Sequence, residues 1–239
     1  MNNALKTFFA FIICVSAHAS PFKITATSWL VADGGGKIIQ GERTQSVHSI
    51  ASITKLMTAM VVLDSNADLD QKIGPYSRKE LIELALVKSD NKAAEALCDS
   101  FPEGKIECIH RMNLKAHELG MENTHYVEST GLSVFNVSTA EDLIKLVIAA
   151  GQYTEINKAA RTPQVKIKLR KKWLIFNNTN PIIGKRYDFI VSKTGFINAS
   201  GGCIALMVDT DAGRKIVVVL GSKNTRTRIP EAEFIIKNY

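Results

Sequence analysis

Apolar and polar residues follow two different periods along the chain, and the change of period divides it into three parts. At both ends, short runs rich in Val, Ile and Leu are separated by turns containing Gly and Asp, which is typical of antiparallel strands. The first pair of runs covers residues 24–32 and 37–41, and a later pair covers residues 201–209 and 215–221. Between the two ends, over residues 52–151, apolar positions recur every three or four residues. That spacing predicts amphipathic helices.

This arrangement predicts an α+β fold in which the two ends of the chain meet. Strands resume where the helical pattern stops, and a last helix is expected over residues 226–237. We therefore expect one antiparallel sheet flanked by helices, with a mostly helical lobe inserted between its strands. The sheet lobe would hold residues 22–51 and 162–239, the helical lobe residues 52–161, and together they would form a single domain over residues 20–239.

The first 19 residues have the pattern of a secretory signal peptide. Lys6 gives a charged start, residues 8–15 form an apolar centre, and Ala17-His18-Ala19 is a small-x-small cleavage site. The apolar stretch is short for a membrane span, which needs about 20 residues, and no later segment is long enough either. Cleavage would release a periplasmic protein without a transmembrane segment, and an uncleaved anchor is the alternative.

The formal net charge of +7 favours acidic partners. In an exported protein these would be wall peptides with free carboxylates or anionic surface polymers, and nucleic acid fits poorly with export. The densest basic run covers residues 166–172, where the alternation predicts a strand with one basic face. A solvated strand or hairpin edge is favoured over a binding patch as the explanation for that run.

Three cysteines remain after the signal. Export implies an oxidising compartment in which disulfides persist. Cys98 and Cys108 lie on neighbouring helical segments joined by a turn at residues 101–104, close enough to pair. Cys203 lies in an apolar strand and is expected to be a buried thiol. The hypothesis is therefore a Cys98–Cys108 bond, with two free thiols as the alternative.

Three short strings carry the candidate chemistry, in the order Ser52-Ile53-Thr54-Lys55, Ser89-Asp90-Asn91 and Lys193-Thr194-Gly195. A serine hydroxyl needs an adjacent base to act as a nucleophile. Residues three apart on a helix share a face, so Lys55 is expected over Ser52. The amine must be neutral to accept a proton, and burial together with the like charge of Lys193 would lower its pKa.

The other two strings would supply the remaining groups of an acyl-transfer site. Ser89 follows an apolar helical run and would relay a proton between Lys55 and the leaving amine, while Asn91 would bond the substrate amide. An ordinary helix cap is the alternative for this string. Lys193-Thr194-Gly195 is expected to end the strand of residues 187–192, which could pair with an extended peptide.

In this interpretation Lys193 and Thr194 bind a carboxylate, and Gly195 leaves room for the backbone to approach. The backbone amides of Ser52 and Phe196 would form an oxyanion hole, in which each donor contributes roughly 3–4 kcal/mol. The five histidines show no metal-ligand spacing, so neither a metal nor a cofactor is expected.

These strings in this order are the signature of penicillin-binding proteins and class A β-lactamases. The chain resembles the low-molecular-mass penicillin-binding proteins of the D-alanyl-D-alanine carboxypeptidase and endopeptidase family, most closely the DD-endopeptidases of the penicillin-binding protein 7 type. Further matching stretches are Ser89-Asp90-Asn91-Lys92-Ala93-Ala94, His117-Glu118-Leu119-Gly120-Met121, Thr130-Gly131-Leu132-Ser133, Asn136-Val137-Ser138-Thr139-Ala140, Asn178-Thr179-Asn180 and Lys193-Thr194-Gly195-Phe196-Ile197-Asn198-Ala199.

The resemblance implies a β-lactamase-like, two-lobed fold and a serine peptidase that cleaves D-alanyl bonds in peptidoglycan stem peptides. Ser52 would be the nucleophile that β-lactams also acylate, and Lys55 the general base. Ser89 and Asn91 would complete the proton relay and the substrate contacts, while Lys193 and Thr194 would hold the substrate carboxylate.

Two departures from the family pattern bear on specificity. Residues 64–76 are markedly shorter than the family's equivalent segment, which borders the active-site lobe. The chain also lacks the carboxy-terminal sheet domain and amphipathic anchor of the larger carboxypeptidases, which favours the endopeptidase branch.

Three alternatives stay open at this point. A DD-carboxypeptidase uses the same chemistry on terminal D-alanine. A serine β-lactamase would need a glutamate-held water, and Glu128 precedes a segment that matches the peptidase pattern instead. A non-catalytic wall-binding protein on the same scaffold is the third.

Overall fold

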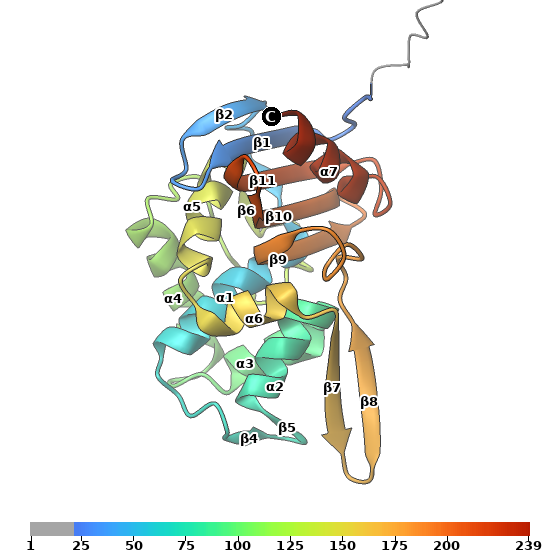
Figure 1. The fold of residues 1–239 in the computed structure, drawn as a ribbon. Helices are drawn as coiled ribbons and strands as arrows, with labels where there is room; N and C mark the ends of the chain where they lie inside the picture. Colours follow the sequence, from blue (N-terminus) through green and yellow to red (C-terminus); the bar gives the residue numbers. More distant parts are fainter. Residues whose placement is uncertain (1–21) are drawn as a thin grey trace, which may run out of the picture.

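The computed structural model describes residues 22–239, which form a five-stranded antiparallel sheet with helices on both faces (Figure 1). The predicted signal peptide, residues 1–19, lies outside the described residues. The strand order in the sheet is β2-β1-β11-β10-β9. Its strands are β1 (Ser28–Asp33), β2 (Ile38–Glu42), β9 (Asp188–Ile197), β10 (Gly201–Thr210) and β11 (Gly213–Ser222).

The two ends of the chain meet inside this sheet. Strand β1 pairs with β11 over six residue pairs, from Ser28 opposite Leu220 to Asp33 opposite Lys215. Both predicted hairpins, β1–β2 and β10–β11, are present. The α+β fold and the inserted helical lobe are therefore confirmed.

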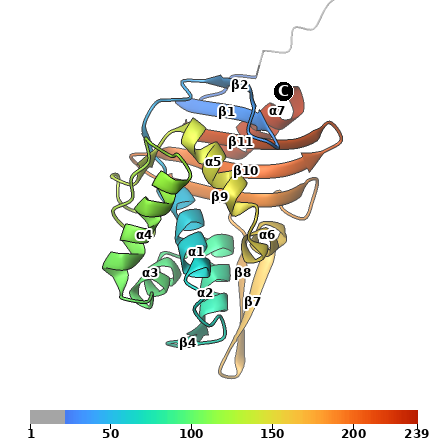
Figure 2. The same ribbon diagram turned by 90° about the vertical axis from the view of Figure 1, so that its left-hand side faces the viewer.

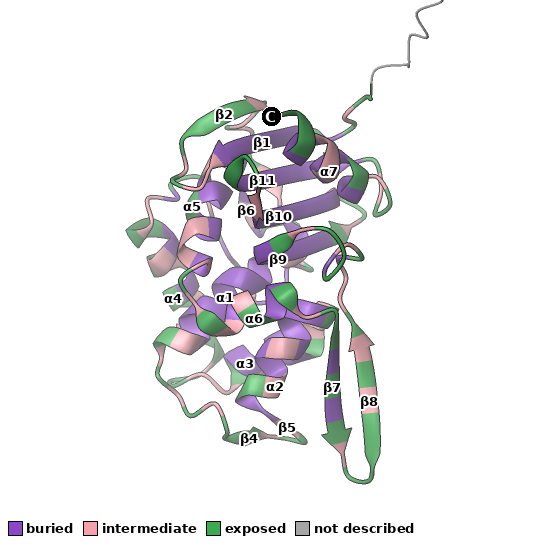
Figure 3. Cartoon of the chain, viewed as in Figure 1, coloured by how far each residue is buried: buried purple, intermediate pink, exposed green. Residues whose placement is uncertain are grey.

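Each central strand is buried on both faces, which explains its nearly continuous apolar sequence. Side chains of β1 alternate, so that Leu30 and Ala32 face the helical lobe while Trp29 and Val31 face the other side. Helix α7 (Arg228–Asn238) covers that other side through Ile229, as well as Ala232, Ile235 and Ile236. Burial of both faces makes the sheet a rigid support for the residues at its β9 edge (Figure 3).

The helical lobe is built around α1 (Thr54–Asp64), which lies across the middle of the other helices (Figure 2). Nine residues of α1, Thr54 to Val62, are buried, so this helix has no solvent face. The remaining elements between β2 and β7 are β3 (His48–Ser49), β4 (Lys72–Ile73), β5 (Tyr76–Ser77), α2 (Arg78–Glu83), a π-helical turn (Leu84–Lys88), α3 (Asn91–Asp99), α4 (Lys105–Glu118), β6 (Val137–Ser138), α5 (Ala140–Ala150) and α6 (Thr154–Arg161).

Strands β7 (Gln164–Leu169) and β8 (Lys172–Asn177) form a separate hairpin that extends along the helical lobe (Figure 1). The sequence analysis assigned these residues to the sheet lobe. They pair only with each other because their apolar face packs against the π-helical turn of the helical lobe instead. The run predicted as one strand over residues 166–172 is in fact the last part of β7, a turn at Arg170 and Lys171, and the first residue of β8.

The Cys98–Cys108 disulfide joins α3 to α4, with 5.4 Å between the two Cα atoms, and Cys203 is a buried free thiol. Both cysteine predictions are confirmed. None of the helices described over residues 22–239 has the length and apolarity needed to cross a bilayer.

Loss of this disulfide is expected to lower the stability of the folded chain. The bond closes a loop with a sequence separation of 10, for which the chain-entropy relation gives roughly 2–3 kcal/mol. A Cys98→Ala/Cys108→Ala variant should therefore melt about 5–10 °C lower than the oxidised wild type. The measurement is the melting temperature with and without reductant. Reductant should lower the melting temperature of the wild type and leave that of the variant unchanged; equal values for both oxidised proteins would contradict the prediction.

Candidate active site

The candidate nucleophile lies in a tight turn rather than in the first turn of an α-helix. Ser52 belongs to a 3-10 helix, Ala51–Ile53, and α1 begins only at Thr54. Ala51 has a φ of +47°, a left-handed conformation that costs a non-glycine residue about 1–3 kcal/mol. The Thr54 hydroxyl donates to the Ala51 carbonyl at 2.8 Å and helps to hold this turn. The sequence correctly predicts a helix after Ser52, but not the strained turn that holds the serine half-exposed.

The amine of Lys55 lies against the hydroxyl of Ser52. Lys55 Nζ donates to Ser52 Oγ at 2.9 Å and to Asn91 Oδ1 at 2.7 Å. A third bond goes to the carbonyl of Thr130. Every hydrogen of the ammonium group therefore has a partner, and the amine has a fixed direction toward the hydroxyl.

Burial lowers the pKa of Lys55 to about 8. The charges of Glu128, Asp90 and Glu95 oppose this shift. The sequence analysis expected the like charge of Lys193 to lower this pKa, and the repulsion falls on Lys193 instead. Complete burial, and then the charges of Lys55 and Arg228, lower the pKa of Lys193 well below its usual range. With this pKa about a tenth of Lys55 is neutral at pH 7, and the neutral form is the one that a general base requires.

The Ser89-Asp90-Asn91 string forms the junction between a π-helical turn and α3. Ser89 ends the turn with a φ of +60°, and Asp90 caps α3 by accepting from the amide of Ala93 at 3.0 Å. Asp90 also pairs with Lys88 at 2.8 Å and so points away from Ser52. π-Helical turns are frequent at functional sites because they redirect the residues that follow.

The structure differs from the expected relay in what Ser89 contacts. Its hydroxyl accepts a hydrogen bond from Lys193 Nζ at 2.8 Å, and it is Asn91 that bonds Lys55. The cause is geometric: in the left-handed conformation of Ser89, its side chain points to the sheet, while Asn91 starts α3 beside α1. The three strings meet, but through the pairs Ser52–Lys55, Lys55–Asn91 and Ser89–Lys193.

Strand β9 carries the third string in its interior. The prediction that Lys193-Thr194-Gly195 ends the strand is wrong, because β9 continues to Ile197 and pairs with β10 throughout. Lys193, Thr194 and Gly195 are all buried, since the strand is covered on both sides. The Thr194 hydroxyl donates to the hydroxyl of Thr179 at 2.7 Å, which ties β9 to the segment after the β7–β8 hairpin.

Gly195 lets β9 lie directly against the serine turn. A Cβ placed on Gly195 would be 3.0 Å from the backbone nitrogen of Ser52 and from the carbonyl oxygen of Ile50. Arg228 of α7 then fixes the next peptide unit, because its Nη1 donates to the Gly195 carbonyl at 2.6 Å. That same peptide unit carries the amide of Phe196, one of the two expected oxyanion donors. Arg228 was missed by the sequence analysis, and no motif marks it.

The sequence also did not predict that the loop over residues 128–136 contacts Lys55. Glu128 accepts from the amides of Thr130 and Gly131, both at 2.7 Å, and from Asn136 Nδ2 at 2.8 Å. This buried network directs the Thr130 carbonyl to Lys55. Because the carboxylate is committed to the loop, Glu128 is poorly placed to hold a hydrolytic water in the manner of a class A β-lactamase.

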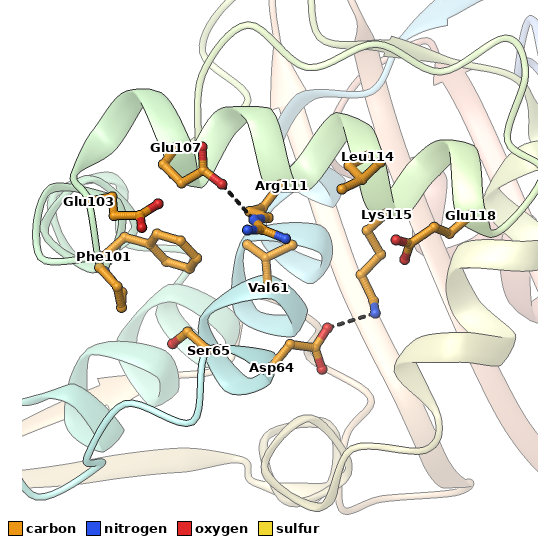
Figure 4. Close-up of a pocket in the computed structure, with 11 residues that line it drawn as sticks. Val61, Asp64, Ser65, Phe101, Glu103, Glu107, Arg111, Leu114, Lys115 and Glu118 are labelled. Atoms are coloured by element: carbon orange, nitrogen blue, oxygen red, sulfur yellow. Dashed lines mark hydrogen bonds and ion pairs between the residues drawn. The ribbon is translucent and has the colours of Figure 1, made fainter.

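One hollow of the surface lies away from these residues. A pocket of about 410 Å³ between α1 and α4 is lined by apolar and charged side chains (Figure 4). Two ion pairs line it, Glu107–Arg111 along α4 and Asp64–Lys115 between α1 and α4, and none of the motif residues reaches it. Within residues 22–239, no group of His, Cys, Asp or Glu side chains is arranged to hold a metal ion.

Comparison with known proteins agrees with the site geometry. The sequence profile of the family D-alanyl-D-alanine carboxypeptidase, peptidase S11, matches residues 15–74 and 70–224. The two matched pieces meet at residues 70–74, inside the segment that looked shortened in the sequence.

Two curated relatives are D-alanyl-D-alanine endopeptidases. The one from Pseudomonas aeruginosa is 38% identical over 234 residues and aligns with 88% of this chain and 76% of its own length. The one from Escherichia coli is 37% identical over 238 residues, covering 90% and 77%. Among solved structures, penicillin-binding protein D2 from Listeria monocytogenes in its ampicillin-bound form superposes with a TM-score of 0.81 at 26% identity, covering 90% of this chain and 97% of that one.

Proposed function

The chain belongs to the D-alanyl-D-alanine carboxypeptidase family of serine peptidases, S11, and from that premise we propose that it is a DD-endopeptidase of the periplasm. Its substrate would be the D-alanyl cross-link between two peptidoglycan stem peptides. The observation that carries the proposal is the 2.9 Å contact between Lys55 Nζ and Ser52 Oγ, in a site where the pKa of the amine is lowered to about 8. The two curated relatives, both D-alanyl-D-alanine endopeptidases, support cross-links as the target.

The first half of the reaction forms an ester. Neutral Lys55 takes the proton of the Ser52 hydroxyl while Oγ attacks the carbonyl carbon of the D-alanyl bond. Negative charge then develops on the carbonyl oxygen, where the amides of Ser52 and Phe196 would donate to it. Arg228 supports this step by holding the Gly195 carbonyl at 2.6 Å and with it the orientation of the Phe196 amide.

Collapse of this intermediate breaks the C–N bond. The leaving amine needs a proton, which the hydroxyl of Ser89 would give while regaining one from Lys193, its partner at 2.8 Å. Water would then attack the ester carbon of Ser52, and the ester C–O bond would break. The Lys55 ammonium would return its proton to Oγ, and the proton lost by the water would return to Lys193, so that the serine and both lysines are restored. Asn91 would orient the substrate amide, and Lys193 with Thr194 would bind the substrate carboxylate.

Two features support export of the mature enzyme, residues 20–239. The amino-terminal pattern predicts a cleavable signal. The Cys98–Cys108 disulfide is the kind of bond that persists in oxidising compartments such as the periplasm.

Labelling with a fluorescent penicillin tests the acyl-enzyme part of the proposal. Because a β-lactam carbonyl would react with the same hydroxyl, the wild type should form a stable adduct and Ser52→Ala should form none. Melting temperature is the control for folding, and a Ser52→Ala protein that still labels would place the nucleophile elsewhere. An adduct that turns over within seconds would instead indicate a β-lactamase.

Digestion of purified wall fragments tests the choice of substrate. A DD-endopeptidase should convert cross-linked dimers into monomers. Release of free D-alanine from uncross-linked pentapeptides, with dimers left intact, would identify a DD-carboxypeptidase. A protein that binds wall fragments but cleaves neither would be a non-catalytic member.

A further inference from the structure

The positive charge of this protein is concentrated in one segment. Between Ile156 and Tyr187 the sequence has nine Lys and Arg residues and no Asp or Glu. The chain as a whole has a formal charge of +7, so the residues outside this segment carry a slight negative excess. Because the positive charge is localised, it produces a positive electrostatic potential at one surface, while the rest of the protein is not basic.

The β7–β8 hairpin holds the part of this charge that is not neutralised. Arg161 pairs with Asp188, Lys158 with Glu155 and Arg186 with Glu233. No carboxylate among the described residues pairs with the five cations of the hairpin, which are Lys166, Lys168, Arg170, Lys171 and Lys172. These groups are therefore available to an external anion.

The outward face of the hairpin also exposes two large apolar side chains. Trp173 is 63% and Ile175 57% exposed. The register places Lys168 opposite Trp173 and Lys166 opposite Ile175, so all four side chains lie on one face. The opposite face, including Val165 and Ile167, is buried against the helical lobe. An exposed tryptophan does not stabilise a hairpin that pairs with no other strand. Exposed aromatic residues flanked by cations are typical of binding surfaces.

The base of the hairpin lies next to the candidate active site, through a residue of its inward face. Phe176 of β8 lies beside Lys88, whose Nζ is 4.7 Å from the ring centroid. Phe176, Lys88 and Asp90 line a pocket of about 370 Å³. Asp90 lies between Ser89 and Asn91, so the base of the hairpin adjoins the lobe that carries the site, and the outward face lies on the other side of the same two strands.

From this we infer that the outward face formed by Lys166, Lys168, Trp173 and Ile175 is a secondary binding surface for the peptidoglycan polymer that carries the bond to be cut. The inference rests on the proposed function and concerns a part of the substrate that lies outside the active site. Free carboxylates of neighbouring stem peptides would bind the lysines as charge-assisted pairs. Sugar or aliphatic portions of the same polymer would pack on Trp173 and Ile175.

A lipid bilayer fits this face less well. Interfacial binding requires an apolar face that enters the headgroup region by about 5–10 Å. Here Ile175 lies in the middle of the hairpin and Trp173 near its turn, but the tip itself is formed by Arg170 and Lys171, so insertion of the tip would bury charges. The polymer, by contrast, is already held at the adjoining site and needs only to extend along the hairpin, which raises its effective concentration there.

Binding to intact sacculi tests the inference in a Ser52→Ala background, so that the wall is not digested during the measurement. Trp173→Ala/Ile175→Ala and Lys166→Gln/Lys168→Gln should each weaken binding by at least about fivefold. Matched controls are Ile106→Ala, an exposed apolar residue on α4, and Lys79→Gln/Lys237→Gln, which removes two exposed charges elsewhere. Both controls should bind like the parent, and equal binding by all variants would overturn the inference.

Two further measurements separate this surface from the active site. With Ser52 restored, the hairpin variants should be acylated by penicillin at the wild-type rate but digest intact sacculi more slowly. If the wild type itself is not acylated, the proposed function fails, whatever the hairpin does. Loss of binding to vesicles containing phosphatidylglycerol, with sacculus binding unchanged, would overturn the inference in favour of a membrane surface.

Discussion

Replacement of Lys55 by methionine is expected to slow acylation of Ser52 by about 10²–10⁴-fold, the usual contribution of a positioned general base. Methionine keeps most of the buried volume of the side chain but has no lone pair able to take the serine proton. No other amine can substitute, because Lys193 Nζ is committed to Ser89 and to the Thr194 carbonyl. The measurement is the second-order rate constant for labelling by a fluorescent penicillin.

The pH dependence of the same rate constant identifies the base. Burial lowers the pKa of Lys55 to about 8, and the neutral form is the reactive one. The wild-type rate should therefore rise with pH, about tenfold per unit well below pH 8, and level off above it. This rise should be absent in Lys55→Met. Lys79→Met, which removes an exposed amine from α2, should retain both the rate and the profile. A Lys55→Met protein that labels within threefold of wild type, with the same profile, would exclude Lys55 as the base.

Local periodicity was enough to predict the elements of the fold and the Ser52–Lys55 pair. Strands at both ends were recognisable because β1, β10 and β11 are apolar runs bounded by turns. Ser52 and Lys55 are three residues apart, and the helical turn before α1 brings the hydroxyl and the amine within hydrogen-bonding distance. The predicted disulfide was also local, since it joins the ends of two consecutive helices.

Contacts between distant segments could not be predicted in the same way. Ser89 was assigned to Lys55, but its left-handed backbone directs the hydroxyl to Lys193, which is 104 residues away. Arg228 reaches the Gly195 carbonyl from α7, and its sequence surroundings resemble any amphipathic helix. The end of β9 was misplaced because a strand covered on both faces shows no alternation after Ser192. Packing, rather than local propensity, determines each of these features.

The hydrogen-bond network around Glu128 shows how packing between distant segments holds the catalytic groups in position. Its loop provides the Thr130 carbonyl to Lys55 and places Gly131 directly against the serine turn. A strained residue such as Ala51 persists only when its surroundings hold it from several sides. The loop and Gly195 of β9 supply two of those sides, so the position of Ser52 depends on segments from both lobes.

Gly131→Ala is accordingly expected to slow acylation by at least about 100-fold, although residue 131 has no role in the chemistry. A Cβ at this position would be 1.9 Å from the Ala51 carbonyl oxygen and 2.7 Å from the backbone nitrogen of Ser52. These are backbone atoms, so the turn or the loop must move, and a displacement of about 1 Å can cost 10²-fold in rate. Gly213→Ala is the matched control, because Gly213 also has a positive φ, +105°, but has nothing within 4 Å of an added Cβ.

Both variants should lose stability from the left-handed conformation, by about 1–2 kcal/mol, but only Gly131→Ala should lose acylation. Rate constants for penicillin labelling and melting temperatures, measured side by side, separate the two effects. If Gly131→Ala melts no more than a few degrees below Gly213→Ala and labels within threefold of it, the serine turn tolerates a shift of its neighbouring loop. Preorganisation of Ser52 by contact with residue 131 would then be the wrong explanation for the geometry of this site.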